Sequence, residues 1–183
     1  MSVIRFSSEF SGAYQAVNVW HFLTPTPATT THANEAIDAV DAFFSSFPTY
    51  MRAGTWTHGN RVVTVDNEPN FVVAATPETT TTTGSSPAPN QVAAGITWQT
   101  DFIGKSYRGR SYIGPLSLLG LETDGQTIKT AFQVALETAA TTLMAPLASG
   151  TQLCVWSPTG QFGNLVTSRV VRAGYRTQRR RLT

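Results

Sequence analysis

Residues 14–48 read YQAVNVWHFLTPTPATTTHANEAIDAVDAFFSSFP, and the hydrophobic period of this stretch changes once. Residues 14–23 alternate, which predicts a β-strand with Val17, Val19 and His21 on one face. Residues 24–31 form a loop, because each of its two prolines lacks a backbone donor and restricts the residue before it. Beyond the loop, three- and four-residue spacing predicts an amphipathic helix that ends before Pro48. Its apolar face consists of Ala36, Ile37, Val40, Phe43, Phe44 and Phe47.

In the rest of the chain, the sequence predicts more strands than helices. Residues 55–57 and 61–66, joined by a turn at 58–60, are typical of a β-hairpin. Further strands are expected at 71–75, 91–98, 107–113, 151–156 and 165–175, with the tryptophans of the strands packed in the core. A second helix covers 128–143, with candidate caps at Asp124 and Thr127. This order predicts an α+β fold with a mostly antiparallel sheet and two amphipathic helices; a single β jelly roll with helical insertions is the alternative.

The length of 183 residues fits one domain, which we place at residues 1–175, followed by a basic C-terminal tail at 176–183. Residues 76–90 contain five consecutive threonines and three prolines, so we expect an exposed low-complexity loop there. The chain has no apolar run long enough for a signal peptide or a membrane span, which predicts a protein that does not bind membranes.

Charged residues make up only 13% of the chain, about half the usual share, whereas threonine occurs 28 times. A surface with so few charges can be covered by neighbouring subunits without burying unpaired ions. The single Cys154 cannot form a disulfide within the chain, so stability has to come from packing or assembly.

The charge is unevenly distributed along the chain. Residues 1–137 hold seven bases and all eleven acids, a net charge of −4, and residues 138–183 hold six arginines and no acid. Guanidinium groups match phosphate oxygens well, so the cluster indicates attraction to nucleic acid, although a basic end can also serve solubility alone. The candidate contacts are Arg172, Arg176, Arg179, Arg180 and Arg181, which would bind the backbone without sequence preference.

A second candidate lies at residues 107–112, Tyr-Arg-Gly-Arg-Ser-Tyr, where bases alternate with other residues. In a strand, Arg108 and Arg110 share one face, and Tyr107, Gly109 and Ser111 take the other. The arginine pair is suited to backbone phosphates. The competing interpretation is that both arginines pair with local acids such as Asp101.

Signatures of catalysis are weak. The histidines, at 21, 32 and 58, lie in a strand, in a loop and in a turn, without the spacing of a metal site. Cys154 lies in an apolar segment and behaves there as a small hydrophobe. Gly104-Lys-Ser106 lacks the preceding glycine of a phosphate-binding loop, because position 99 is Gln. We therefore predict no enzymatic activity, no metal and no cofactor.

Four segments resemble small coat proteins of non-enveloped viruses with compact single-stranded genomes: Trp98-Gln-Thr-Asp101, residues 107–116, Val155-Trp-Ser-Pro158 and Gln178-Arg-Arg-Arg181. The resemblance covers roughly residues 90–181. It implies that copies of the chain assemble into an icosahedral shell around single-stranded RNA or DNA and reside in the virion. The Arg tail or the face of Arg108 and Arg110 would then point inward.

Two other classes of protein remain open. A bacteriophage tail or head-to-tail connector component would share the low charge and the β-rich pattern but would need no genome-binding tail. A monomeric nucleic-acid-binding module would bind without forming large particles.

Overall fold

Strand β1 (Ser2–Gly12) occupies the centre of the main sheet in the computed structural model, which describes residues 1–12, 16–46, 48–65, 72–82, 93–102, 104–125 and 127–153. β2 (Ala16–Thr24) pairs with one edge of β1 from Ser2↔Thr24 to Phe10↔Ala16. The other edge of β1 pairs first with β4 (Val62–Thr64) and then with β3 (Gly54–His58). β5 (Val72–Val73) lies beyond β4, and β6 (Glu78–Thr82) lies beyond β3. Every pairing is antiparallel, so the predicted α+β class is confirmed.

The predicted hairpin between residues 55–57 and 61–66 is wrong. β3 and β4 do not pair with each other; they follow one another along the same edge of β1. In the segment between β3 and β4, the Gly59 N–H donates to the Ser7 carbonyl at 2.7 Å, and this hydrogen bond keeps the segment attached to β1. Gly59 has φ +80°, and a Cβ there would lie 2.3 Å from Ile37 Cδ1, so this step requires glycine. The eleven-residue length of β1 offers partners to both strands.

The threonine run is also more ordered than predicted, because residues 78–82 form β6 rather than a loop. Thr80 and Thr82 are buried, while Thr79 and Thr81 are exposed. Threonine is β-branched and suits a half-buried strand, as long as a hydroxyl that points inward has a hydrogen-bond partner. The Thr82 hydroxyl donates to the Arg52 carbonyl at 2.6 Å. Residues 83–92 lie outside the described part of the chain.

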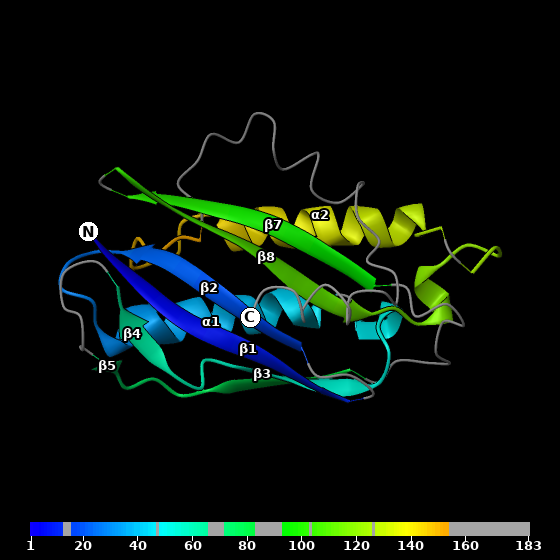
Figure 1. Ribbon diagram of the computed structural model, residues 1–183, viewed down its shortest axis with the longest axis horizontal. Coiled ribbons are helices and arrows are strands. Elements are labelled where there is room, and N and C mark those ends of the chain that lie inside the picture. Colours follow the sequence, from blue (N-terminus) through cyan, green and yellow to red (C-terminus); the bar gives the residue numbers. More distant parts are fainter. Residues whose placement is uncertain are drawn as a thin grey trace, which may run out of the picture.

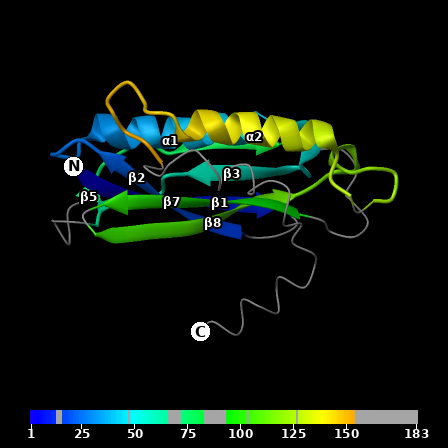
Figure 2. The ribbon, with the colours of Figure 1, turned by 90° about the horizontal axis from the view of Figure 1, so that it is seen from above.

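Helices α1 (Thr30–Ser45) and α2 (Thr130–Met144) form a second layer against one side of the strands (Figure 2). Thr29 caps α1, since its backbone N–H donates to His32 Nδ1 at 3.2 Å and its side chain accepts from the His32 N–H. The cap predicted for α2 is wrong: Lys129 occupies the N-cap without a side-chain bond, and Asp124 instead accepts from the Thr127 N–H at 2.8 Å.

A long hairpin of β7 (Ala93–Phe102) and β8 (Lys105–Pro115) lies beside β2 and in front of α2 (Figure 1). Trp98 stacks on Trp20 with ring centroids 6.3 Å apart, and the Thr100 hydroxyl donates to the His21 carbonyl at 3.0 Å. Two short 3₁₀ turns, η1 (Pro48–Tyr50) between α1 and β3 and η2 (Leu118–Gly120) after β8, lie side by side, and the Ser117 N–H donates to the Tyr50 carbonyl at 2.8 Å.

One apolar core joins the two layers, with side chains from both helices, β1, β2, β3 and the hairpin. Trp20, Trp56 and Trp98 belong to it, as predicted, and Trp156 lies outside the described residues. The described strands form a single layer under helices, not the two facing sheets of the jelly-roll alternative (Figure 2). The predicted strand at 151–156 is described only to residue 153, where Gln152 forms a bridge with Leu23. The predicted strand at 165–175 lies outside the described residues.

No helix among the described residues is long and apolar enough to cross a membrane.

Packing of the hairpin depends on Gly109, which lies opposite Trp98. A Cβ at position 109 would lie 2.1 Å from Trp98 Cζ2, so we expect Gly109→Ala to displace this buried ring. The free energy of unfolding should fall by about 1–3 kcal/mol, as measured by urea titration. Thr79→Ala, at an exposed strand position, is the control and should change stability by less than about 0.5 kcal/mol. Equal stability of Gly109→Ala and wild type would contradict this packing.

Candidate nucleic-acid interface

The side of the strands that faces away from the helices carries two exposed arginines, Arg5 and Arg108, and we call it the outer face. In β1, the even-numbered residues from Ile4 to Phe10 are buried toward the helices. Side chains alternate along a strand, so Arg5, Ser7 and Glu9 belong to the outer face. In β2, the same alternation places Val17, Val19 and His21 there, as predicted.

Arg108 lies on the outer face of the hairpin. Tyr107, Gly109 and Ser111 pair with the inward positions Thr100, Trp98 and Ile96, so the predicted inward face of β8 is confirmed, and Arg108 lies on the other face. Arg108 is exposed and lies opposite Gln99, and position 110, on the same face by alternation, lies opposite Thr97. Among the described side chains, no carboxylate oxygen lies within 4.0 Å of Arg108.

Arg5 is a functional candidate that the sequence analysis missed. It is exposed in β1 and lies directly across from His21. The His21 ring stacks on Tyr107, 5.1 Å between centroids, and Tyr107 precedes Arg108. Tyr107 points inward from β8, so His21 contacts the inner side of the hairpin, whereas Arg108 lies on its outer side. The alternation of residues 3–10 could have placed Arg5 on an exposed face, but not beside the hairpin.

His21 contributes no charge to this surface at neutral pH. Burial, and then the positive charge of Arg5, lower the pKa of His21 to about 4. Its Nδ1 atom is buried and has no hydrogen-bond partner among the described residues. His21 is thus a neutral ring between Arg5 and the inward side of the hairpin.

The helix layer has the opposite charge. Its carboxylates belong to Glu35, Asp38 and Asp41 on α1, Glu78 on the adjoining β6 and Glu137 on α2, against the single base Lys129. Burial, and then the charges of Asp41 and Glu35, raise the pKa of Asp38. Among the described residues, the helix layer is therefore mainly acidic, while the outer face of the strands carries Arg5, Arg108 and the single acid Glu9.

The tail arginines predicted to bind nucleic acid, together with Cys154, lie outside the described residues. These arginines are Arg172, Arg176, Arg179, Arg180 and Arg181. Of the predicted contacts, the structure therefore places Arg108 and the backbone of Arg110, and it adds Arg5 to them.

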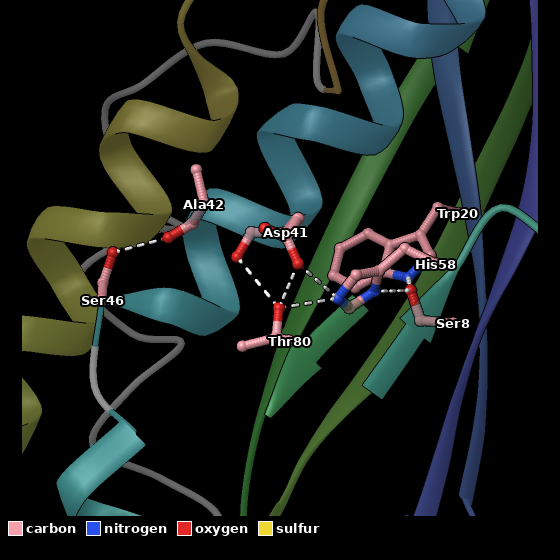
Figure 3. A network of polar contacts seen from close by, with 7 residues as sticks. All are labelled: Ser8, Trp20, Asp41, Ala42, Ser46, His58 and Thr80. Atoms are coloured by element: carbon pink, nitrogen blue, oxygen red, sulfur yellow. Dashed lines mark hydrogen bonds and ion pairs between the residues drawn. The ribbon is translucent and has the colours of Figure 1, made fainter. Parts of the chain in front are cut away.

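A second polar cluster connects β1, β2, β3, β6 and α1 inside the protein (Figure 3). Its centre is His58, which was expected in a turn but is the fully buried last residue of β3. His58 Nδ1 lies 2.8 Å from Ser8 Oγ, and Nε2 lies 3.2 Å from Thr80 Oγ1 and 3.5 Å from Asp41 Oδ1. Trp20 Nε1 donates to Ser8 Oγ at 2.8 Å.

The hydrogen bonds of this cluster define one tautomer. The Thr80 hydroxyl donates to Asp41, so its oxygen accepts from His58 Nε2–H. Nδ1 then accepts from the Ser8 hydroxyl, whose oxygen in turn accepts from Trp20. Burial lowers the pKa of His58 to about 4, although Asp41 acts in the opposite direction.

The order of serine, histidine and aspartate resembles that of a nucleophilic triad, but its surroundings differ. Ser8 and His58 are fully buried, and Ser8 Oγ is already bonded to Trp20, so a substrate has no access to it. The cluster instead ties five elements together. Within the described residues, no group of three or more His, Cys, Asp or Glu side chains could hold a metal ion.

Comparison with known proteins gives no match to a family model, to a curated protein or to a solved structure. The function therefore has to be inferred from the chain itself.

Acid should destabilise the fold through the two neutral histidines. Between pH 6.5 and about 4 the unfolded chain binds protons at His21 and His58 and the folded chain does not, so stability is complete above pH 6.5 and falls as the pH decreases. Each histidine contributes on the order of 3 kcal/mol to this loss. Urea unfolding at pH 7 and pH 4.5, followed by tryptophan fluorescence, measures it.

His21→Phe separates the two contributions. Phenylalanine keeps the ring stack and removes the unpaired nitrogen, so stability at pH 7 should stay within about 1 kcal/mol of wild type. The loss between pH 7 and pH 4.5 should be roughly halved. An unchanged loss would show that His21 does not titrate in this window.

Proposed function

We propose that this protein is a viral coat protein that assembles into an icosahedral shell and binds its single-stranded genome through arginines, without sequence specificity. The separation of charge carries the proposal. Six arginines and no acid occupy residues 138–183, and among the described residues Arg5 and Arg108 are exposed on strands, whereas Glu35, Asp38, Asp41, Glu78 and Glu137 lie in or beside the helix layer. A shell subunit needs such a polarity, because one side meets a polyanion and the other does not.

The exposed side of α2 supports self-association. Its exposed residues are all uncharged: Thr130, Ala131, Val134, Thr138, Thr141 and Thr142. The Thr141 hydroxyl donates to the Glu137 carbonyl at 2.8 Å, and that of Thr142 donates to the Thr138 carbonyl at 3.1 Å. These two hydroxyls are bonded inside the helix, so a neighbour could cover Thr141 and Thr142 without leaving their hydroxyls unpaired.

Assembly also makes a small basic segment effective. The arginines of one chain bind weakly at physiological salt, but many copies around one enclosed genome act as a multivalent surface. RNA or DNA binding in the virion therefore follows from copy number and not from a tight site on the monomer.

The purified protein should form closed particles that contain nucleic acid, seen by negative-stain electron microscopy and by the ratio of absorbance at 260 and 280 nm. Replacing Arg179, Arg180 and Arg181 by Gln should leave the particles intact and lower their nucleic-acid content. A control that removes the same charge elsewhere, Arg61→Gln with Lys105→Gln and Lys129→Gln, should keep the content of the wild type.

The other outcomes are distinct. Open rings or tubes whose assembly ignores the tail substitutions would indicate a bacteriophage connector or tail component. A monomer by light scattering that still binds nucleic acid would indicate a binding module. A monomer without nucleic acid would refute the coat-protein function.

A charge on α2 should block assembly. Val134 is 55% exposed, so Val134→Lys should fold normally by circular dichroism, yet particles should be reduced at least tenfold in size-exclusion chromatography, because a contact would bury the ammonium group. The control, Ala42→Lys, places the same charge on the exposed side of α1 and should assemble. Normal particles from Val134→Lys would show that α2 lies outside the contacts between copies.

A further inference from the structure

We infer that β6 can leave the sheet as a unit, and that the His58 cluster (Ser8, Trp20, Asp41, His58 and Thr80; Figure 3) holds it in place until His58 takes up a proton. The inference goes beyond the proposed function and does not depend on it, because it concerns a change of conformation within one chain. Release of β6 would uncover the edge of β3 from Gly54 to His58, and an uncovered edge can pair with another strand.

β6 is held by hydrogen bonds and not by apolar side chains. Its residues are one glutamate and four threonines, and within the described part of the chain it pairs with β3 alone. The two threonines that point inward, Thr80 and Thr82, bury hydroxyls that donate to Asp41 and to the Arg52 carbonyl. β3, by contrast, buries the Trp56 ring. Because the release of β6 exposes little apolar surface, it should cost less free energy than global unfolding.

The ladder between β3 and β6 identifies the amides that report this release. The Gly59 N–H donates to the Ser7 carbonyl on β1, so the alternation of an antiparallel ladder turns the backbone groups of Trp56 toward β6. Thr80 lies opposite Trp56, and its N–H therefore belongs to the ladder with β3, as does that of Thr82 two residues later. Exchange of these two amides with solvent requires β6 to separate from β3.

The hydrogen bonds of the His58 cluster require a neutral imidazole. Nε2–H donates to the Thr80 hydroxyl at 3.2 Å, and Nδ1 accepts from the Ser8 hydroxyl at 2.8 Å. A protonated ring has no acceptor, so Nδ1–H would point at Ser8 Oγ, and the Ser8 hydroxyl would lose the acceptor for its own proton. The positive charge would also lie in a fully buried site, stacked on Phe44 with 5.0 Å between ring centroids. Proton uptake therefore weakens the contacts that hold β6.

Carboxylates face His58 from two elements. Asp41 on α1 lies 3.5 Å from Nε2, and Glu78 on β6 lies directly opposite His58 in the ladder. β1 and β2 contribute Ser8 and Trp20, neither of which carries a charge. Burial lowers the pKa of His58 to about 4, and the attraction of Asp41 offsets only part of this effect. The open form, with His58 in water, would thus bind a proton that the closed form does not.

Asp38 on α1 acts in the opposite direction. Burial, and then the charges of Asp41 and Glu35, raise the pKa of Asp38, and a side-chain hydrogen bond with Glu78 offsets part of the increase. A carboxyl group whose pKa is raised in the closed form binds its proton there first, so acid favours the closed form at this position. Acid release of β6 therefore has to arise at His58 and not at Asp38.

The difference in proton binding sets the size of the effect. At pH 4.5 an imidazole in water, with its pKa of 6.5, is charged, whereas His58 in the closed form is mostly neutral. Between pH 7 and pH 4.5 the equilibrium constant for release should therefore rise on the order of 50-fold. The protection of the Thr80 and Thr82 amides against hydrogen exchange should fall by the same factor, after correction for the intrinsic effect of pH on exchange.

Hydrogen exchange of the full-length chain, read by mass spectrometry with fragmentation to single residues, measures this protection at both pH values and in dilute urea. Thr80 and Thr82 should exchange by local release, so dilute urea should leave their protection unchanged. The amide of Phe6, in the middle of β1, should be better protected and should respond to urea, because its exchange requires global unfolding. Equal protection and an equal urea response for Thr80 and Phe6 would overturn the inference.

His58→Gln tests the origin of the acid response. Glutamine is neutral at both pH values and can donate and accept hydrogen bonds, so the 50-fold change at Thr80 and Thr82 should disappear. His21→Phe, which removes the other histidine of lowered pKa, should keep it. An acid response at Thr80 that survives in His58→Gln would refute the role of His58.

A matched pair of threonine substitutions tests the cluster at pH 7, where His58 is neutral. Thr80→Val keeps the shape of the side chain but removes the hydroxyl between His58 and Asp41, so the protection of the Thr82 amide should fall at least fivefold. Thr81→Val makes the same change at the next residue, whose side chain is exposed, and should leave this protection unchanged. Equal protection of Thr82 in the two variants would show that the cluster does not hold β6.

A reversible cross-link tests the release without changing the cluster. Thr57 and Thr79 lie directly opposite each other in the ladder, and their side chains alternate with those of His58 and Thr80, so they point away from the cluster. Thr57→Cys/Thr79→Cys, with Cys154→Ser to remove the native thiol, should form a disulfide that fixes β6 to β3. In the oxidised protein, Thr80 should keep its pH 7 protection at pH 4.5, and reduction should restore the acid response. Acid exchange at Thr80 in the oxidised protein would overturn the inference.

Discussion

The pairing of β1 on both of its edges is the constraint on which the rest of the structure depends. One edge is taken by β2 over nine residue pairs, and the other is shared by β3 and β4. A strand held on both edges cannot shift its register by one residue without exchanging its buried and exposed side chains. The register of β1 therefore sends Ile4, Phe6 and Phe10 into the core and leaves Arg5 outside.

Local patterns in the sequence predicted the local parts of the fold. The three- to four-residue spacing located α1 and α2, and alternation located β2, β8 and the outward position of Arg108. The pairing of β3 and β4 could not be predicted from local patterns, because both strands pair with β1, some 50 residues earlier in the chain. The threonine run, considered alone, predicts a loop. Thr80 and Thr82 can be buried in a strand only because distant residues supply hydrogen-bond partners for their hydroxyls.

In the candidate site, too, local features could be predicted from the sequence and long-range contacts could not. Charge counting found the arginine-rich end, and strand alternation found the face of β8. The contact between His21 and Tyr107, about 85 residues apart in sequence, arises only when β2 and β8 lie side by side. The buried cluster of His58 was equally hidden, since its five side chains come from five separate elements. Tertiary pairing thus decides which of the polar residues serve the surface and which serve the interior.

The two-layer arrangement has a geometric consequence. A slab one strand layer and one helix layer thick has a front and a back of different chemistry (Figure 2). In the proposed shell, a subunit inserted upside down would present the acids of its helix layer where its neighbours present Arg5 and Arg108, so repulsion and attraction alone would disfavour the wrong orientation. Any curved enclosure that such subunits make would inherit its interior lining from the fold of a single chain.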